Sequence, residues 1–128
     1  MSLIDERGAS FSYNTVGSNT IVQVVAEPAV LYHVSISHQG GSVGYLQLYN
    51  NGTQDTATGT PDITFAVNAG TAAAGTPTLM VLRDVDFGPV GIAFNGGLSY
   101  LWAAGVTGTA AHGANANITL VYRGSAIT

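Results

Sequence analysis

The chain has no lysine and few charged residues of any kind. Only 8% of its 128 residues are charged, and seven Asp and Glu residues stand against three arginines. An ordinary soluble domain has about a quarter of its residues charged. The net charge of −4 offers no basic footprint for a nucleic acid. Charged residues are depleted at the cores of subunit interfaces, so the composition favours a subunit packed among neighbours and excludes a nucleic-acid partner.

The chain also has no cysteine, which excludes disulfides, thiolate chemistry and zinc-thiolate sites. At its N-terminus, Asp5 and Glu6 stand where a signal peptide has a basic region and then an apolar run. No stretch approaches the roughly 20 apolar residues of a membrane span. We therefore expect a soluble protein that is made and assembled in the cytoplasm without export and has no membrane partner.

Helical periodicity is scarce, whereas strand signals recur at short intervals. Alternating or β-branched runs are separated by turn signals such as Asn50-Asn51-Gly52. The runs cover residues 20–26, 30–37, 45–49, 63–67, 79–82, 90–94, 98–104 and 118–122. About eight short strands with these spacings indicate an all-β, single antiparallel β-sandwich or jelly roll. We assign this domain to residues 20–128, and we expect residues 1–19, which are poor in strand pattern, to form an arm.

The alternation within the runs predicts which side chains face the core. In the run 30–37, Val30, Tyr32, Val34 and Ile36 alternate with Leu31 and three polar residues, which is typical of a half-buried strand. In the run 45–49, two leucines share one face and two tyrosines share the other. Residues 69–75 and 105–115 are rich in small side chains and are expected to be loops.

Carboxylates and histidines offer little support for a metal site or for catalysis. Asp84 and Asp86 would share a strand face and, with Asp62, could ligate calcium, but a solvated turn is the simpler interpretation. Glu27 adds one more carboxylate for a glycosidase-type pair. The three histidines are His33, His38 and His112, and their spacing predicts isolated surface or interface side chains. With no Gly-x-Ser-x-Gly elbow either, we expect no enzyme activity, no cofactor and no metal.

The aromatic residues Tyr45, Tyr49, Tyr100 and Trp102 leave three interpretations open. They could belong to the core, with Trp102, the sole tryptophan, inside it and the tyrosines on either side. They could form a subunit interface, where a large apolar body with a polar tip is favoured. They could also stack on sugar rings.

The order of several short motifs resembles small all-β virion proteins of tailed bacteriophages, of the head decoration or cement type. The likeness covers residues 28–123 and is carried by the motifs Val30–Ser37, Tyr45–Asn50, Thr60-Pro61, Gly91–Tyr100 and Val121-Tyr122-Arg123. The resemblance implies a homo-oligomer, most often a trimer, that has no enzymatic role. Its partners would be the major capsid protein and further copies of itself, and its location would be the outside of the capsid.

We therefore expect a decoration protein that stabilises the head by bridging capsid subunits, each weak contact being reinforced by many copies. The residues expected at subunit or capsid contacts lie in the arm and on the tyrosine-bearing strands: Leu3, Ile4, Phe11, Tyr13, Tyr45, Tyr49, Tyr100 and Trp102. The alternative is a carbohydrate-binding or receptor-binding module of a tail or fibre. A hydrolase that uses Asp84 or Asp86 is the third possibility.

Overall fold

The computed structural model describes residues 9–15 (backbone only), 21–38, 40–53, 58, 60–70, 83–114 and 116–124. These residues form nine strands and no helix. The strands are β1 (Ala9–Thr15), β2 (Val22–Val25), β3 (Ala29–His38), β4 (Gly44–Tyr49), β5 (Ile63–Val67), β6 (Arg83–Asp86), β7 (Ile92–Phe94), β8 (Leu98–Ala103) and β9 (Ala116–Gly124). The expected all-β sandwich is confirmed.

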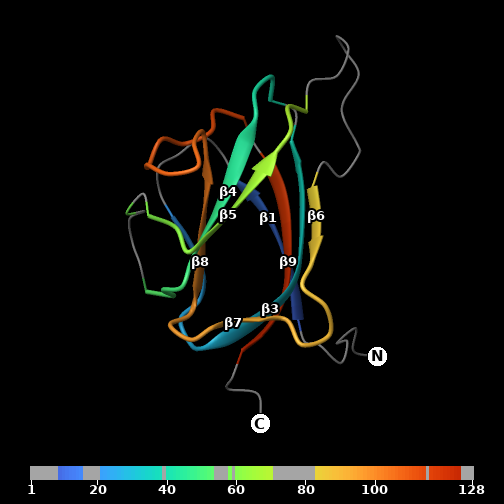
Figure 1. The fold of residues 1–128 in the computed structure, drawn as a ribbon, viewed down its shortest axis with the longest axis vertical. Helices are drawn as coiled ribbons and strands as arrows, with labels where there is room; N and C mark the ends of the chain where they lie inside the picture. Colours follow the sequence, from blue (N-terminus) through green and yellow to red (C-terminus); the bar gives the residue numbers. More distant parts are fainter. Residues whose placement is uncertain are drawn as a thin grey trace.

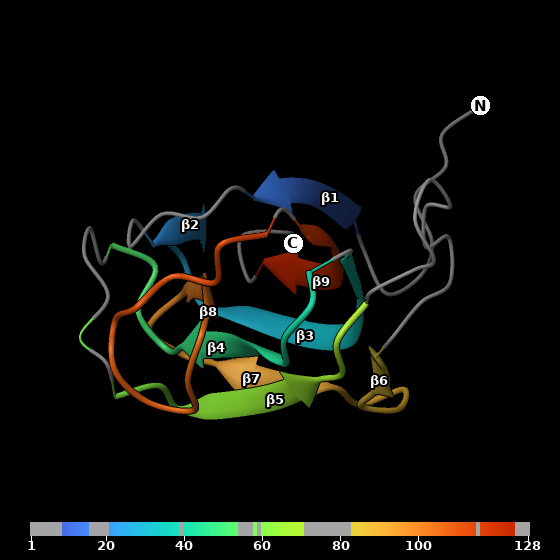
Figure 2. The same ribbon diagram turned by 90° about the horizontal axis from the view of Figure 1, so that it is seen from above.

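The strands form two antiparallel sheets that face one another (Figures 1 and 2). One sheet has the order β1-β9-β3-β6, with the short β7 also paired to β3, and the other has the order β2-β8-β4-β5. Leaving β7 aside, successive strands alternate between the sheets except at the β4–β5 hairpin. The first strand pairs with the last, the second with the last but one, and so inward to the hairpin. This nested order is that of a jelly roll.

Strand β1 lies within the segment that was expected to be an arm. It pairs with β9 of the same chain, with Phe11 opposite Leu120 and Tyr13 opposite Ile118. Residues 9–15 therefore belong to the sandwich, and the expectation that the whole segment 1–19 lies apart from the sheets is corrected. Leu3 and Ile4 lie outside the described residues, so their proposed contact with a neighbouring subunit stays a prediction.

The core fills the space between the two sheets, as the alternation in the strands requires. On β4, Leu46 and Leu48 face inward, and on β8, Tyr100 and Trp102 do so. The opposite sheet contributes Leu31, Val34 and Ile36 of β3 and Ile118, Leu120 and Tyr122 of β9. The predicted alternation of residues 45–49 is thus confirmed, and the face with the two leucines is the inner one.

A β-bulge in β3 changes the predicted face of its first half. The register of β3 against β9 shifts between Leu31 and His33, and a bulge adds one residue to one strand only. Leu31 consequently joins the core together with Val34 and Ile36, whereas Val30 is only half-buried. The simple alternation from Val30 to Ile36 was wrong at its N-terminal end, because it assumed an uninterrupted pleat.

Gly44 allows Trp102 to lie flat against the start of β4. A Cβ atom added at Gly44 would lie 2.2 Å from Cη2 and 2.4 Å from Cζ2 of Trp102. Any larger residue would displace the indole ring. This close approach places Trp102 at one end of the core, next to the loops that join the strands there.

Candidate contact surface

The β2-β8-β4-β5 sheet contains no charged residue in any of its four strands. The charged residues of the described part of the chain lie elsewhere: Glu27, Asp62, Arg83, Asp84, Asp86 and Arg123. The loop that follows β8, residues 104–114, has no carboxylate, lysine or arginine either, and its one titratable group, His112, is buried. One side of the sandwich is therefore built almost entirely from neutral residues.

The loop after β8 folds back across the outer face of this sheet. The Nε2 amide of Gln47 donates hydrogen bonds to the carbonyls of Gly105 (3.1 Å) and Gly108 (3.0 Å). The hydroxyl of Tyr49 donates to Oε1 of Gln47. Gln47 is fully buried at 0% exposure, so its amide is the polar anchor that holds the loop against the strand.

Further bonds hold the loop in place. The Ala104 amide donates to the Ala110 carbonyl at 2.8 Å, and the Thr64 hydroxyl donates to the Val106 carbonyl at 3.3 Å. Ala103 and Ala111 form an isolated antiparallel bridge. The predicted loop in this segment is thus hydrogen-bonded to itself and to β5, and it covers the outer face of the sheet.

Three of the expected contact residues lie inside the protein. Tyr100 and Trp102 belong to the main core, and Tyr49 forms a second buried cluster with Ile21, Leu101 and Ala103 on the outer side of the sheet. These three side chains cannot contact a capsid or a sugar in the folded chain, so this part of the expectation is corrected. Of the three interpretations of the aromatic residues, a position inside the protein is the correct one for Tyr49, Tyr100 and Trp102.

Tyr45 is the remaining member of the group and is half-buried. It pairs with Ala66 of β5 and Ala103 of β8, which places it on the same outer face. Together with Thr64, Ala66 and residues 104–111, it forms what we call the uncharged face. Val106 protrudes from this face with 54% of its surface exposed.

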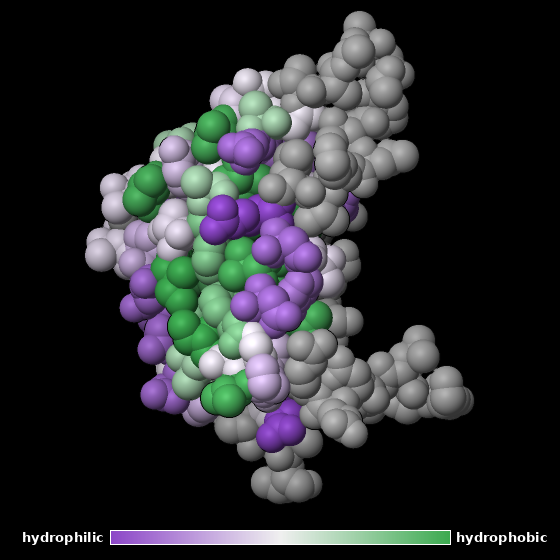
Figure 3. Space-filling model, turned by 45° about the vertical axis from the view of Figure 1, so that its right-hand side comes forward, coloured by the Kyte–Doolittle hydropathy of each residue, from purple (hydrophilic) through white to green (hydrophobic). Residues whose placement is uncertain are grey.

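Figure 3 shows a band of hydrophobic surface bordered by hydrophilic residues. Half-buried aromatic side chains also pack together between β5 and the segment after β6. The rings of Phe65 on β5 and Phe87 after β6 stand 5.9 Å apart, and the Arg83 guanidinium lies 5.9 Å from the Phe65 ring. These contacts close the core between the ends of the two sheets.

Two histidines and the tryptophan form a compact buried cluster. The centre of the His38 ring lies 4.9 Å from the centre of the Trp102 ring and 5.1 Å from that of the His112 ring. The ring centres of Trp102 and His112 are 5.0 Å apart. Each histidine is only 3% exposed. The expectation of isolated surface or interface histidines is therefore wrong for His38 and His112. The fold brings these two residues together from distant parts of the chain.

Both rings of the cluster are hydrogen-bonded to backbone through both nitrogens. Nδ1 of His38 accepts from the Gly40 amide at 3.1 Å, and its Nε2 lies 2.8 Å from the Asn68 carbonyl. Nδ1 of His112 accepts from the Ala114 amide at 3.1 Å, and its Nε2 lies 3.1 Å from the Ser42 carbonyl. An acceptor nitrogen carries no proton, so each ring is neutral with its proton on Nε2.

The third histidine, His33, lies on the outer face of the other sheet. Its Nε2 is 2.5 Å from Oδ1 of Asp84, which also accepts a hydrogen bond from the Ser35 hydroxyl at 3.0 Å. Ser35 and His33 thus bind the same carboxylate oxygen. A catalytic triad needs a serine that donates to the histidine, so this arrangement of residues is not a nucleophilic site.

The carboxylates considered for calcium or for catalysis have separate structural tasks. Oδ1 of Asp86 accepts from the Gly88 amide at 2.8 Å, and Oδ2 of Asp62 accepts from the Asn50 amide at 2.7 Å. Among the described residues, no three His, Asp or Glu side chains converge on a possible metal position. Asp62 and Asp86 thus bind the amides of neighbouring turns. Asp84 and Asp86 themselves lie in strand β6 and not in a solvated turn, so that expectation is corrected.

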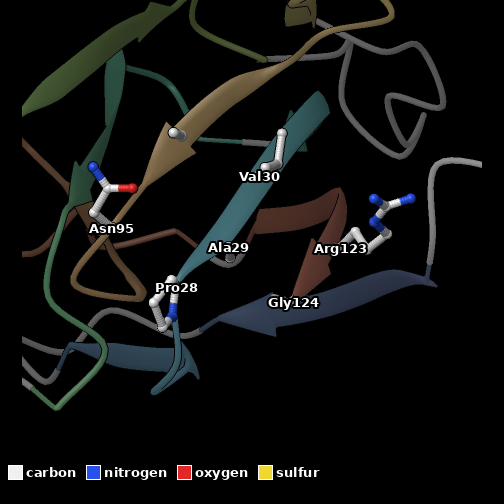
Figure 4. Close-up of a pocket in the computed structure, with 7 residues that line it drawn as sticks. Pro28, Ala29, Val30, Asn95, Arg123 and Gly124 are labelled. Carbon is white, nitrogen blue, oxygen red and sulfur yellow. The ribbon is translucent and has the colours of Figure 1, made fainter. Parts of the chain in front are cut away.

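A shallow pocket of about 260 Å³ lies beside the start of β3 (Figure 4). Its lining is mostly apolar and comprises Pro28, Ala29, Val30, Ala93, Asn95, Arg123 and Gly124. The Arg123 guanidinium points away from the labelled residues on the other side of the pocket. The pocket therefore lacks the convergent polar groups that mark a small-molecule site.

No family model matches the chain, and searches of curated proteins and of solved structures found no match. In the described part of the chain, no helix is long and apolar enough to cross a membrane.

Sequence reasoning missed Gln47 and the pairing of His38 with His112. Gln47 did carry a signal, because a polar residue between two tyrosines sits on the face opposite Leu46 and Leu48. The histidine pair carried none, since the two residues are far apart in the sequence: His38 ends β3, and His112 lies in the loop before β9.

Proposed function

We propose that this protein is a virion structural protein of a tailed bacteriophage, bound to the outer surface of the capsid as a decoration protein. Its partners would be the major capsid protein and further copies of the same chain. It would act by adhesion, each copy bridging neighbouring capsid subunits, with no chemical step.

The observation that carries this proposal is the uncharged face. Burying a charged side chain at an interface is costly unless it is paired, and interface cores are accordingly depleted in charge. A sheet with no charged residue, covered by a neutral loop with the exposed Val106 at its tip, suits permanent contact. We assign the capsid contact to this face.

The fold adds support by analogy. Jelly rolls recur in viral capsid proteins, and also in lectins and cupins. A fold alone does not specify function, so the nested strand order favours the proposal without distinguishing a capsid protein from a sugar-binding one.

The alternative, a carbohydrate-binding or receptor-binding module, has lost most of its expected residues. Sugar recognition by stacking needs exposed aromatic rings, and no aromatic side chain among those described is classed as exposed. Tyr45 is half-buried, and Tyr49, Tyr100 and Trp102 are inside. This alternative is kept as an outcome of the test below.

The proposal is tested by binding to purified capsids that lack the protein. Wild-type chain should co-sediment with such heads and appear as density on their outer surface. Replacing Val106 and Ala66 by glutamate places two carboxylates on the uncharged face at exposed positions and should abolish binding. The control Asn117→Asp adds one charge at an exposed position of β9 and should bind like wild type.

Three results would contradict the proposal. These are a wild-type chain that fails to co-sediment with heads, equal binding of the face variant and the control, and binding of the isolated chain to host polysaccharide in place of capsids. Light scattering provides a further check, because a homotrimer would have about three times the 13.0 kDa mass of one chain.

A further inference from the structure

The His38–His112 pair holds together three loops at one end of the sandwich, the upper end in Figure 1. His38 binds Gly40 and Asn68, and His112 binds Ser42 and Ala114. The loops after β3, after β5 and before β9 therefore all meet at these two rings. The Gly70 amide also donates to the Gly40 carbonyl at 2.9 Å, which joins the first two loops directly.

We propose that His38 and His112 form an acid-sensitive clasp, which is closed while His38 is neutral and releases these loops when His38 is protonated. The added proton goes to Nδ1 of His38, which then becomes a donor and can no longer accept from the Gly40 amide. That amide loses its acceptor, and a positive charge appears in a buried site against the rings of Trp102 and His112.

No carboxylate lies around the pair to offset that charge. Trp102 of β8, Gly40 to Val43, Asn68 to Gly70 and Ala116 of β9 bring none. On β6, which pairs with β3, Arg83 is opposite Ile36 and is positive, and Asp84 is opposite Ser35 and is bound by His33. The Asn68 carbonyl, which lies against Nε2 of His38, offsets only part of the cost of burial.

The electrostatic surroundings of His38 also favour the neutral ring in the closed state. Burial lowers the pKa of His38 from 6.5, the hydrogen bond to Asn68 raises it in part, and the neighbouring His112 lowers it further. The open state takes up protons more readily than the closed one, so opening becomes more favourable as the pH falls below 6.5. In that window the open fraction should rise by about tenfold per pH unit.

Trp102 provides a built-in reporter, because it is the sole tryptophan and lies within 5.0 Å of both rings. The experiment follows its emission between pH 8 and pH 4.5, together with amide hydrogen exchange. We expect an emission change with a midpoint below 6.5. Protection of the Gly40, Gly70 and Ala114 amides should fall by the factor above, while amides of β4 and β8 stay protected.

Two variants provide the comparison. In the double variant His38→Asn with His112→Asn, each side-chain oxygen can accept from the same amide but does not titrate, so the transition should disappear. The control His33→Asn removes the one histidine outside the cluster, and this variant should keep the acid transition. Should the double variant fail to fold, the ¹⁵N shifts of the wild-type rings report protonation and tautomer directly.

The proposal is overturned if His38 stays neutral at pH 5 and the loops stay protected. It is also overturned if the double variant keeps the transition, or if loop and sheet amides lose protection together. The last result would mean that acid unfolds the whole domain and opens no separate clasp.

Discussion

Replacing Gln47 by leucine should loosen the loop that covers the uncharged face. The side chain is fully buried and makes three hydrogen bonds, two to loop carbonyls and one from the Tyr49 hydroxyl. Leucine has a similar volume and keeps the packing, so the change mainly removes these bonds.

The expected loss follows from what each partner can do afterwards. A net hydrogen bond contributes about 0.5–1.5 kcal/mol, and a buried group that loses its partner costs about 1–3 kcal/mol. The Gly108 carbonyl lies at an exposed position and can bind water, whereas the Tyr49 hydroxyl is buried. We therefore expect the free energy of unfolding to fall by about 2–4 kcal/mol, with most of the loss on the Tyr49 side.

The assay is urea unfolding followed by Trp102 fluorescence, with hydrogen exchange of residues 104–111 as a local readout. Adding Tyr49→Phe to the Gln47→Leu variant removes the buried hydroxyl and should recover about 1 kcal/mol. The matched control Thr64→Val removes only the 3.3 Å bond to Val106 and should cost less than about 1 kcal/mol. A loss below about 1 kcal/mol for Gln47→Leu, with unchanged loop exchange, would refute the anchoring role.

Three further outcomes follow from the structure. Gly44→Ala should lower the free energy of unfolding by about 3 kcal/mol, because its Cβ would lie 2.2 Å from the Trp102 ring; a near-wild-type urea midpoint would contradict the close approach. Val90→Asp should change stability by less than about 0.5 kcal/mol, since 84% of the side chain is exposed, and a larger shift in midpoint would mean that Val90 is covered. Because the pKa of His38 is lowered in the folded state, the unfolded state binds more protons below pH 6.5. The melting temperature should therefore decrease from pH 7 to pH 5, and it should decrease less in His38→Asn. A melting temperature that stays constant or rises on acidification would contradict this sign.

Local patterns in the sequence were enough for the fold class and for part of the core. A strand's side chains alternate, so the run Tyr45–Tyr49 places Leu46 and Leu48 on one face, which is the inner one. Ala9–Thr15 has the same kind of signal, because Phe11 and Tyr13 alternate with polar residues, and it forms β1 where an arm was expected.

The outer face of a strand could not be interpreted from alternation alone. Tyr49 faces away from the main core, and it is buried because a loop more than 50 positions further along the chain covers that side. Likewise, the bulge that turns Leu31 inward arises from pairing with β9, a strand far along the sequence. Alternation describes a strand by itself, and such features depend on what packs against it.

The scarcity of charge was determined by the sequence alone, and it remains the strongest indication of how this protein acts. Only the tertiary structure decided where the neutral surface lies, because the strand order places the charged strands β6 and β9 in one sheet and leaves every strand of the other sheet without a charged residue. Only the fold, too, brought His38 and His112 to within 5.1 Å of each other. Composition is a property of the chain, whereas a surface or a buried pair exists only once distant segments have been packed together.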